Sequence, residues 1–442
     1  MENFTLLSIG PIVVATIIAT VSGLWVTFGL PVIWKKRLIQ SVNKEHRATQ
    51  KPGKSSSKAR LTLRNYFEQA FYVIVCALAT VATLFLVANR ISVWYGSWDD
   101  LFNRLEHDAT IHAVTTTPTT NEGIDPRSTE SQQPSDSQAG TPVAENSNTP
   151  SASANARPAA QTPVEFSELQ KAPLNNPVLA RYQKEKRGVW IRARINGQGE
   201  LGEGKTLIYL PPSYLSEPNR AYSVLISLHG IPGSAMEFRD ALDVDRYYGK
   251  TVREGTTAEA IIVVPEPFPR NLDTECMDIP GVSMETWLTT TLPNWLKQNL
   301  RTKDDRNYWA MEGYSAGGWC TAMLTVRHPE IFGAGIIKAG YFAPIYAEGK
   351  EWHDPQDPRY LLREVVKDKP KVKLFVVTGK QDWVFRDSYE EFRANVKYPT
   401  ELTEYEVPGS THRWEIYRQS SIPAYEWLGK NLPGFATSSS GK

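Results

Sequence analysis

The chain has 442 residues, of which 41% are hydrophobic and 22% are charged, and its formal net charge is +1. Because it has no basic patch interleaved with aromatic residues, we do not expect it to bind nucleic acid. It has no P-loop and no glycine fingerprint for a dinucleotide, and none of its seven histidines forms an i, i+4 pair, so we expect neither a cofactor nor a metal.

Two long apolar runs begin the chain. One is nearly uncharged over residues 12–30, and the other covers residues 67–88. Each run is long enough to cross a bilayer, which needs about 20 apolar residues. The first run lacks the basic start of a cleaved signal peptide and is too long to be one. We therefore predict transmembrane helices at 1–34 and 66–90, with a helical hairpin buried in a soluble protein as the alternative.

Basic residues fill the stretch between the two runs. Residues 35–65 carry many lysines and arginines and a single acidic residue, Glu45. Because positive residues stay on the cytoplasmic side of a membrane, we predict that 35–65 is a cytoplasmic loop and that both chain ends lie outside. The protein is then expected to be a multi-pass protein of the cell membrane, with lipid around its two helices and a juxtamembrane segment at 91–114.

The composition changes again at 115–162, where Ser, Thr, Pro and Ala are abundant and large apolar residues are nearly absent. Such a segment cannot bury enough apolar surface to fold. We predict a disordered linker that tethers an extracytoplasmic domain, 163–442, to the membrane. A flexible chain of this length spans on the order of 40 Å, and up to ~160 Å when stretched. The predicted tether would therefore hold the domain off the membrane.

In the predicted outer domain, an apolar strand at 222–228 runs into the loop His229-Gly230-Ile231-Pro232-Gly233. A loop in this position presents backbone N–H groups at the end of a strand. We interpret His229 as a residue that shapes this loop, and Ile231 as the residue whose N–H group is available to a ligand.

A later strand, at 308–312, leads into Gly313-Tyr314-Ser315-Ala316-Gly317 and then into a stretch with a helical pattern. Strand, Gly-x-Ser-x-Gly and helix in this order are typical of the nucleophile elbow of an α/β-hydrolase. We therefore predict that Ser315 is a catalytic nucleophile. In this fold two backbone N–H groups form the oxyanion hole, and we assign them to Ala316 and Ile231.

The acid and the histidine of such a site follow the nucleophile along the chain. A strand at 371–378 ends in a loop with Asp382, and a strand at 401–407 ends in a loop with His412. We predict His412 as the base, because imidazole accepts a proton near neutral pH. Asp382 is the predicted acid, which fixes the imidazole tautomer. Three acidic residues that follow closely are alternatives to it: Asp387, Glu390 and Glu391.

The three cysteines fall in two different regions. Cys76 lies in the second apolar run, whereas Cys276 and Cys320 lie in the predicted outer domain. Disulfides persist on the oxidising side of a membrane. Cys320 follows the nucleophile by about one helical turn, and Cys276 lies in a loop expected at the same end of the sheet. We predict a disulfide between them, with two free buried thiols as the alternative.

Four motifs together resemble the esterase D family, which includes feruloyl and acetyl esterases, S-formylglutathione hydrolase and secreted mycolyltransferases. They are Leu207-Ile-Tyr-Leu-Pro-Pro-Ser-Tyr214, Leu228-His-Gly-Ile-Pro-Gly233, Gly313-Tyr-Ser-Ala-Gly-Gly318 and Thr411-His-Arg-Trp414. The resemblance covers about 188–432 and implies an α/β-hydrolase fold, with a mostly parallel, doubly wound sheet. The mycolyltransferases use a glutamate as the acid and usually have an aspartate where this chain has His229. Both differences favour the general esterase branch.

From these features we predict a membrane-anchored serine esterase, a carboxylic ester hydrolase that acts outside the cytoplasm through an acyl-serine. Its substrate would be a small ester or an ester of a cell-envelope glycan or lipid. Water resolves the acyl-serine in a hydrolase and a sugar hydroxyl resolves it in a transferase, so acyl transfer to envelope glycans is the first alternative. The second is a tethered binding protein or adhesin, which would not need Ser315, Asp382 and His412 together.

Overall fold

The structure of the protein is a computed structural model, and it describes residues 9–48, 56–92, 110–115, 162–171, 176–346, 350–379, 382–407 and 412–437. Most of the predicted linker and of the predicted juxtamembrane segment lies outside these residues. The predicted disorder of the linker therefore stays a prediction.

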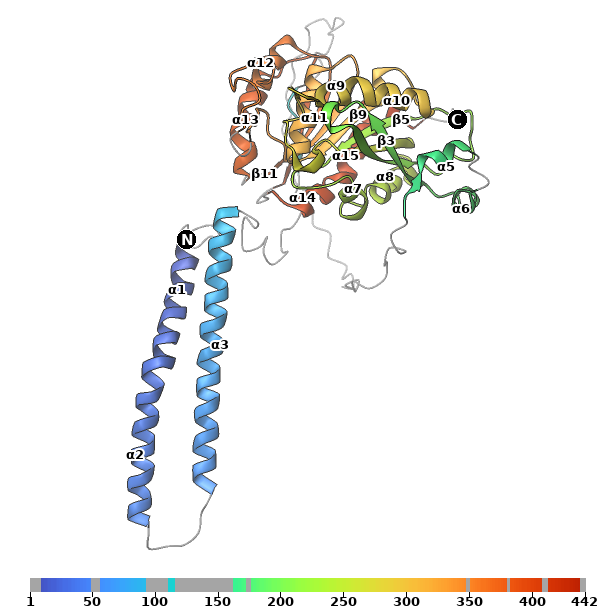
Figure 1. Ribbon diagram of the computed structural model, residues 1–442. Coiled ribbons are helices and arrows are strands. Elements are labelled where there is room, and N and C mark those ends of the chain that lie inside the picture. The colour runs from blue at the N-terminus through green and yellow to red at the C-terminus, as the bar shows by residue number, and fades with distance from the viewer. Residues whose placement is uncertain are drawn as a thin grey trace, which may run out of the picture.

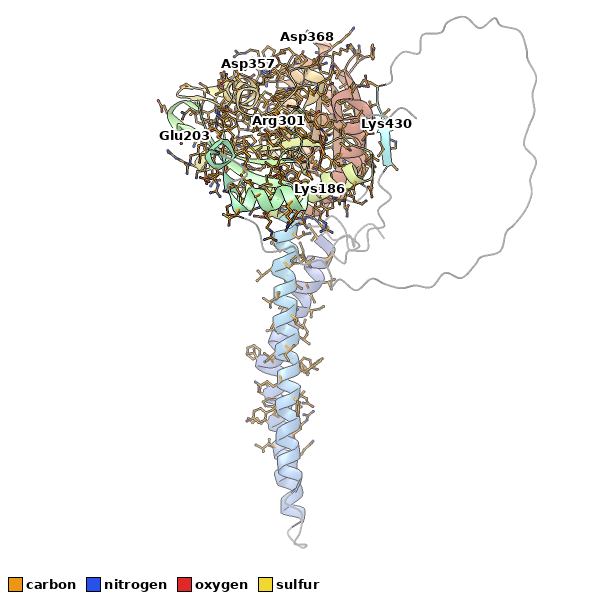
Figure 2. All side chains as sticks on the ribbon, turned by 90° about the vertical axis from the view of Figure 1, so that its right-hand side faces the viewer. Lys186, Glu203, Arg301, Asp357, Asp368 and Lys430 are labelled. Carbon is orange, nitrogen blue, oxygen red and sulfur yellow. A yellow bond between two sulfur atoms is a disulfide. The ribbon has the colours of Figure 1, made fainter. Side chains whose placement is uncertain are left out.

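Two long helical rods form the N-terminal part of the chain (Figure 1). The first rod is continuous through a π-helical turn, and the second lies alongside it; together they comprise α1 (Ile9–Leu24), the turn (Trp25–Gly29), α2 (Leu30–Ala48) and α3 (Ser56–Ser92). By length and composition, residues 9–40 and 66–90 each contain a stretch that is apolar enough to cross a membrane. Figure 2 shows side chains projecting outward along both rods, and most of the large apolar ones are exposed.

The two rods contact each other through small residues, an aromatic pair (Trp25 and Tyr72, with ring centroids 6.3 Å apart) and an ion pair. Gly23 lies against Cys76, and the Cys76 thiol donates a hydrogen bond to the Ala19 carbonyl at 3.5 Å. Small residues at such positions let two helices approach closely. Further along, Arg37 Nη1 lies 2.7 Å from Glu68 Oε2. These contacts fix the two helices as an antiparallel hairpin.

A ten-stranded mixed sheet forms the centre of the remaining chain, with the order β1-β12-β11-β10-β9-β5-β6-β4-β3-β2. Strands β5, β6 and β9 to β11 are largely buried, and all of them except β9 contain Val or Ile, which is typical of a parallel sheet covered on both faces. The strands are β1 (Thr110–Ala113), β2 (Val164–Glu165), β3 (Val189–Asn196), β4 (Glu203–Leu210), β5 (Ser223–Leu228), β6 (Ala260–Pro265), β9 (Trp309–Tyr314), β10 (Ala334–Lys338), β11 (Lys373–Gly379) and β12 (Glu401–Val407). A separate hairpin pairs β7 (Asp278–Ile279) with β8 (Val282–Ser283).

Helices cover both faces of this sheet, because alternate strand residues feed two separate buried clusters. One cluster includes Trp287, Trp319 and Leu362, and the other includes Tyr248 and Leu428. The helices are α5 (Phe166–Lys171), α6 (Pro177–Glu185), α7 (Met236–Asp240), α8 (Val244–Arg253), α9 (Met284–Thr286), α10 (Leu292–Asn299), α11 (Ala316–Arg327), α12 (Leu362–Val365), α13 (Trp383–Asn395), α14 (Trp414–Gln419) and α15 (Ser421–Asn431). The α/β class predicted from the sequence is confirmed, with a mixed sheet.

The sheet begins earlier in the chain than the sequence predicts. Residues 110–113, which were assigned to the juxtamembrane segment, form β1 and pair antiparallel with β12 at one edge of the sheet. In Figure 2, β1 is the short cyan strand at the margin of the domain. The predicted division at 163 therefore leaves out one strand of the domain.

Candidate active site

Ser315 occupies a sharp turn between β9 and α11. Its backbone has φ 57° and ψ −125°, in a region that residues with a side chain rarely adopt. Its N–H group donates a hydrogen bond to the Lys338 carbonyl at 3.0 Å, and its own carbonyl accepts one from the Trp319 N–H group at 3.0 Å. The turn therefore holds the half-buried serine at the C-terminal end of β9.

Two glycines of the Gly-x-Ser-x-Gly pattern are required by close packing. A Cβ atom on Gly317 would lie 2.1 Å from the Leu228 carbonyl oxygen, and one on Gly313 would lie 2.1 Å from the Gly317 carbonyl oxygen. No side chain fits at such distances. The turn can therefore pack between β5 and β9 only with glycine at both positions.

Asp382 and His412 lie together at the same edge of the sheet. Because β9, β10, β11 and β12 run parallel, the loops after β9, β11 and β12 meet there, and these loops carry Ser315, Asp382 and His412. The His412 Nδ1 atom is 2.8 Å from Asp382 Oδ2. Only 3% of the Asp382 side chain is exposed, against 34% of His412. A carboxylate can only accept a hydrogen bond from the Nδ1–H group, and this tautomer leaves Nε2 free to accept a proton.

Among the acidic alternatives, Asp387 is exposed on α13, and Glu391 pairs with Arg363 at 2.6 Å. Glu390 is also exposed and lies 4.0 Å from Arg393. The structure therefore brings Asp382 to His412. Within the stretches that it describes, no hydrogen bond joins Ser315 to His412; such bonds are often long before a substrate binds. The role of the three residues as a triad stays a prediction.

An aromatic cluster that the sequence did not indicate connects the serine turn to the histidine. The Tyr314 ring stacks on Tyr417 with centroids 5.0 Å apart, and it also lies 5.0 Å from Trp414. The rings of His412 and Tyr417 contact each other edge to face, with their centroids 5.9 Å apart. Burial raises the pKa of Tyr417 well above its usual range, and the nearby Asp382 charge adds to the shift. Tyr417 thus packs directly against the imidazole of His412.

The loop after β5 packs directly against the serine. A Cβ atom on Gly230 would lie 3.0 Å from Tyr314 Cε2 and 3.1 Å from Ser315 Cβ, so a side chain here would be tightly packed against the serine turn. The buried His229 lies 2.7 Å through Nδ1 from the Gly230 carbonyl oxygen and 2.6 Å through Nε2 from Glu266 Oε1. These contacts confirm that His229 shapes the loop. Glu266, which completes this pair, was not identified from the sequence.

The orientation of one peptide group supports the assigned oxyanion donors. Because the Gly230 carbonyl points at His229, the Ile231 N–H group on the same trans peptide points the opposite way. The Ala316 N–H group begins α11, and the first N–H groups of a helix have no partner within it. The assignment of Ile231 and Ala316 to the oxyanion hole stays a prediction.

A disulfide fastens a second loop beside the serine turn. Cys276 and Cys320 are joined with their Cα atoms 5.6 Å apart. Next to them, the Trp319 indole N–H donates to the Glu275 carbonyl at 3.0 Å, and the Trp319 ring stacks on Tyr341 at 5.6 Å. The loop before β7 and the loop after β10 are thereby connected to α11.

Glu275 links the same two loops through its side chain. Its buried carboxyl group accepts hydrogen bonds from the Tyr346 N–H at 2.7 Å, the Ile345 N–H at 3.2 Å and the Tyr341 hydroxyl at 3.4 Å. Burial raises its pKa from 4.5 to about 8, and the charge of Asp273 adds to the shift. The folded protein therefore binds this proton more tightly than the unfolded chain does.

This raised pKa predicts a loss of stability in alkaline solution. The contribution of protonated Glu275 is fully present below pH 4.5 and is lost as the pH rises through about 8. At about 1.4 kcal/mol per pKa unit, this contribution is on the order of 5 kcal/mol. We expect Glu275→Gln to remove most of this loss of stability at alkaline pH. The melting temperature of the variant should then exceed that of the wild type by roughly 5 to 10 °C at pH 9.

Thermal unfolding of the full-length protein in detergent, followed by circular dichroism between pH 5 and pH 9, measures this difference. Glu426→Gln, a change at an exposed residue, is the matched control and should follow the wild type. If the melting temperatures of the wild type and Glu275→Gln changed with pH by the same amount across this range, the prediction would be contradicted.

The mixed sheet, the helices on both faces and the serine at a strand-to-helix turn define an α/β-hydrolase-like protein. A profile of the family described as "Putative esterase" matches residues 202–428, which is just over half of the chain. The chain belongs to this family and is an esterase-family hydrolase.

The relatives found by sequence and by structure each match about half of the chain. An uncharacterized protein of Corynebacterium glutamicum is 26% identical over 239 residues, which are 50% of this chain and 56% of that protein. The match thus spans little more than half of that relative. Among solved structures, a ferulic acid esterase is 19% identical, with a TM-score of 0.47 over 56% of this chain and 98% of its own. An S-formylglutathione hydrolase from Agrobacterium tumefaciens is 18% identical, with a TM-score of 0.45 over 55% of this chain and 96% of its own.

Proposed function

We propose that the protein is a membrane-anchored serine esterase that hydrolyses carboxylic esters outside the cytoplasm. The observation that carries the proposal is the pair formed by His412 Nδ1 and Asp382 Oδ2 at 2.8 Å, at the sheet edge where Ser315 is held on its strained turn. A buried carboxylate that orients an imidazole beside an activated serine is the arrangement that acyl transfer through serine requires.

In the proposed reaction, His412 Nε2 removes the Ser315 proton as Oγ attacks the ester carbonyl carbon. The negative charge on the carbonyl oxygen is stabilised by the N–H groups of Ala316 and Ile231, which can contribute about 3 kcal/mol each. His412 then gives its proton to the departing alcohol, and an acyl-serine remains. Water, deprotonated by His412, attacks the acyl-serine, and the acid leaves as Ser315 regains its proton.

Two features support the proposed side of the membrane. The Cys276–Cys320 disulfide suits an oxidising compartment. The basic stretch at 35–65 suits a cytoplasmic loop between two membrane helices, which places the following domain outside. Both features agree with an anchor formed by the α1–α3 hairpin.

The test is hydrolysis of nitrophenyl butyrate by the full-length protein in detergent, combined with labelling by a fluorophosphonate. We expect turnover that the label abolishes, with the added mass found on the peptide that contains Ser315. Labelling at Ser315 without ester hydrolysis would instead favour acyl transfer to an envelope glycan. A folded protein that neither turns over nor takes the label would contradict the proposed function.

A further inference from the structure

The direction of β1 shows where the chain from the membrane helices enters the domain. In the antiparallel pair, Thr110 lies opposite Glu406 and Ala113 lies opposite Thr403. Because β12 ends at Val407, β1 begins beside the C-terminal end of β12. The loops with Ser315, Asp382 and His412 lie at this same end of the strands, which we call the active-site edge of the domain. The chain therefore joins the domain at its active-site edge.

Residues 110–115 are firmly part of the domain. Beyond the strand itself, the Val114 N–H donates to the Leu402 carbonyl at 2.8 Å, and Val114 packs against the buried core. The Thr115 hydroxyl accepts a hydrogen bond from the Leu402 N–H at 2.7 Å and donates one to the Thr400 carbonyl at 3.0 Å. We call residues 110–115 the strap, because they tie the chain to β12.

The strap shortens the connection between domain and membrane helices. α3 ends at Ser92 and β1 begins at Thr110, so the connecting chain reaches about 60 Å at most, whatever its conformation. A connection that ran from Ser92 to Pro163 without the strap would reach up to ~240 Å. The distance between the end of α3 and the active-site edge is thus limited to about the size of the domain, which is roughly 50 Å across.

The Ser/Thr/Pro-rich stretch, residues 116–161, consequently connects two parts of the same domain. It follows the strap, which contains the outermost strand on one side of the sheet, and precedes β2, which is the outermost strand on the other side. Ten strands make a sheet roughly 43 Å wide, and the stretch is long enough to cross that distance. It therefore does not set the distance between the domain and the membrane, contrary to its predicted role as a tether.

We propose that the strap keeps the active-site edge turned toward the bilayer, and that the substrate is an amphiphilic ester presented at the membrane surface. This inference rests on the proposed membrane anchor and serine esterase site. An ester in a distant polymer would be served better by a long tether, whereas a connector that leaves from the active-site edge favours an ester held in the lipid layer to which the enzyme is anchored.

Two matched insertions test the proposal in the full-length protein reconstituted into liposomes. A Gly/Ser segment of about 40 residues is placed either between Asp99 and Asp100, in the connector, or between Gly140 and Thr141, in the 116–161 stretch. The substrates are nitrophenyl palmitate carried in the liposomes and nitrophenyl butyrate in solution. The effective concentration of the active site at the membrane surface falls as about the −3/2 power of the connector length. The connector insertion should therefore lower palmitate hydrolysis about sixfold.

We expect the connector insertion to leave butyrate hydrolysis unchanged, and the second insertion to leave both activities unchanged. Equal losses from both insertions would show that the strap is not docked, and no loss from either would show that the short connector does not hold the active-site edge at the bilayer. Both results overturn the inference. Absence of Ser315-dependent butyrate hydrolysis in the wild type would instead overturn the proposed function.

A distance measurement gives a readout that does not depend on activity. A donor dye is attached to a cysteine at Asp387, near the active-site edge, or at Lys397, before β12 at the opposite edge; both residues are exposed. A Cys76→Ala background removes the free thiol in the hairpin. Energy transfer to acceptor lipids should be stronger from Asp387→Cys than from Lys397→Cys, and the connector insertion should reduce the difference. Equal transfer from both positions would refute the orientation.

Discussion

His412→Ala is expected to lower kcat for nitrophenyl butyrate about 10⁶-fold while the protein remains folded. In the proposed reaction the imidazole takes the Ser315 proton, and its removal leaves a neutral hydroxyl that attacks esters poorly. Serine and base act as one unit, so the loss should be as large as for Ser315→Ala. Steady-state hydrolysis by the purified full-length variants measures the effect, and circular dichroism checks the fold.

The double variant is the sharper part of this experiment. If Ser315 and His412 act together, the double variant should be no slower than either single one, because the residual rate comes from the remaining binding and oxyanion groups. A further large drop in the double variant would mean that the residues act independently. Near-normal turnover by His412→Ala would remove the base assignment and return Ser315 to a structural role in the turn.

The serine turn could be predicted from the sequence because its determinants are local. Gly313, Ser315 and Gly317 specify the strand-to-helix turn within five residues, and the structure shows why neither glycine tolerates a side chain. Asp382 and His412 were found by their place after β-rich runs, since parallel strands bring successive loops to one edge. Here a short pattern and a general rule of the fold were sufficient.

The parts that the sequence did not indicate depend on distant contacts. Strand β1 is four residues long and exposed along its length, so it carries no alternating pattern, and only its pairing with β12, far along the chain, defines it. The partnership of His229 with Glu266 and the contact of Tyr417 with His412 also join separate elements. Each residue alone is compatible with an ordinary surface or core position, so no motif identifies it.

Asp382→Asn is expected to lower kcat about 10⁴-fold without loss of the fold. The Asp382 carboxylate accepts a hydrogen bond from the Nδ1–H group of His412, which favours the tautomer with Nε2 unprotonated. An asparagine amide can donate to Nδ1, which favours the other tautomer and places a proton on Nε2. The imidazole then cannot act as a base, and it also loses the negative charge that stabilises it once protonated.

Asp387→Asn is the matched control, because it makes the same chemical change five residues further on, at an exposed position of α13. It should leave kcat and KM within about twofold of the wild type, as expected for a surface change away from the site. A large loss from Asp387→Asn, with little from Asp382→Asn, would reassign the acid to α13. Because Asp382, unlike Asp387, is both buried and in contact with His412, the pair of variants tests whether that contact, and not acidity in this region, supports the reaction.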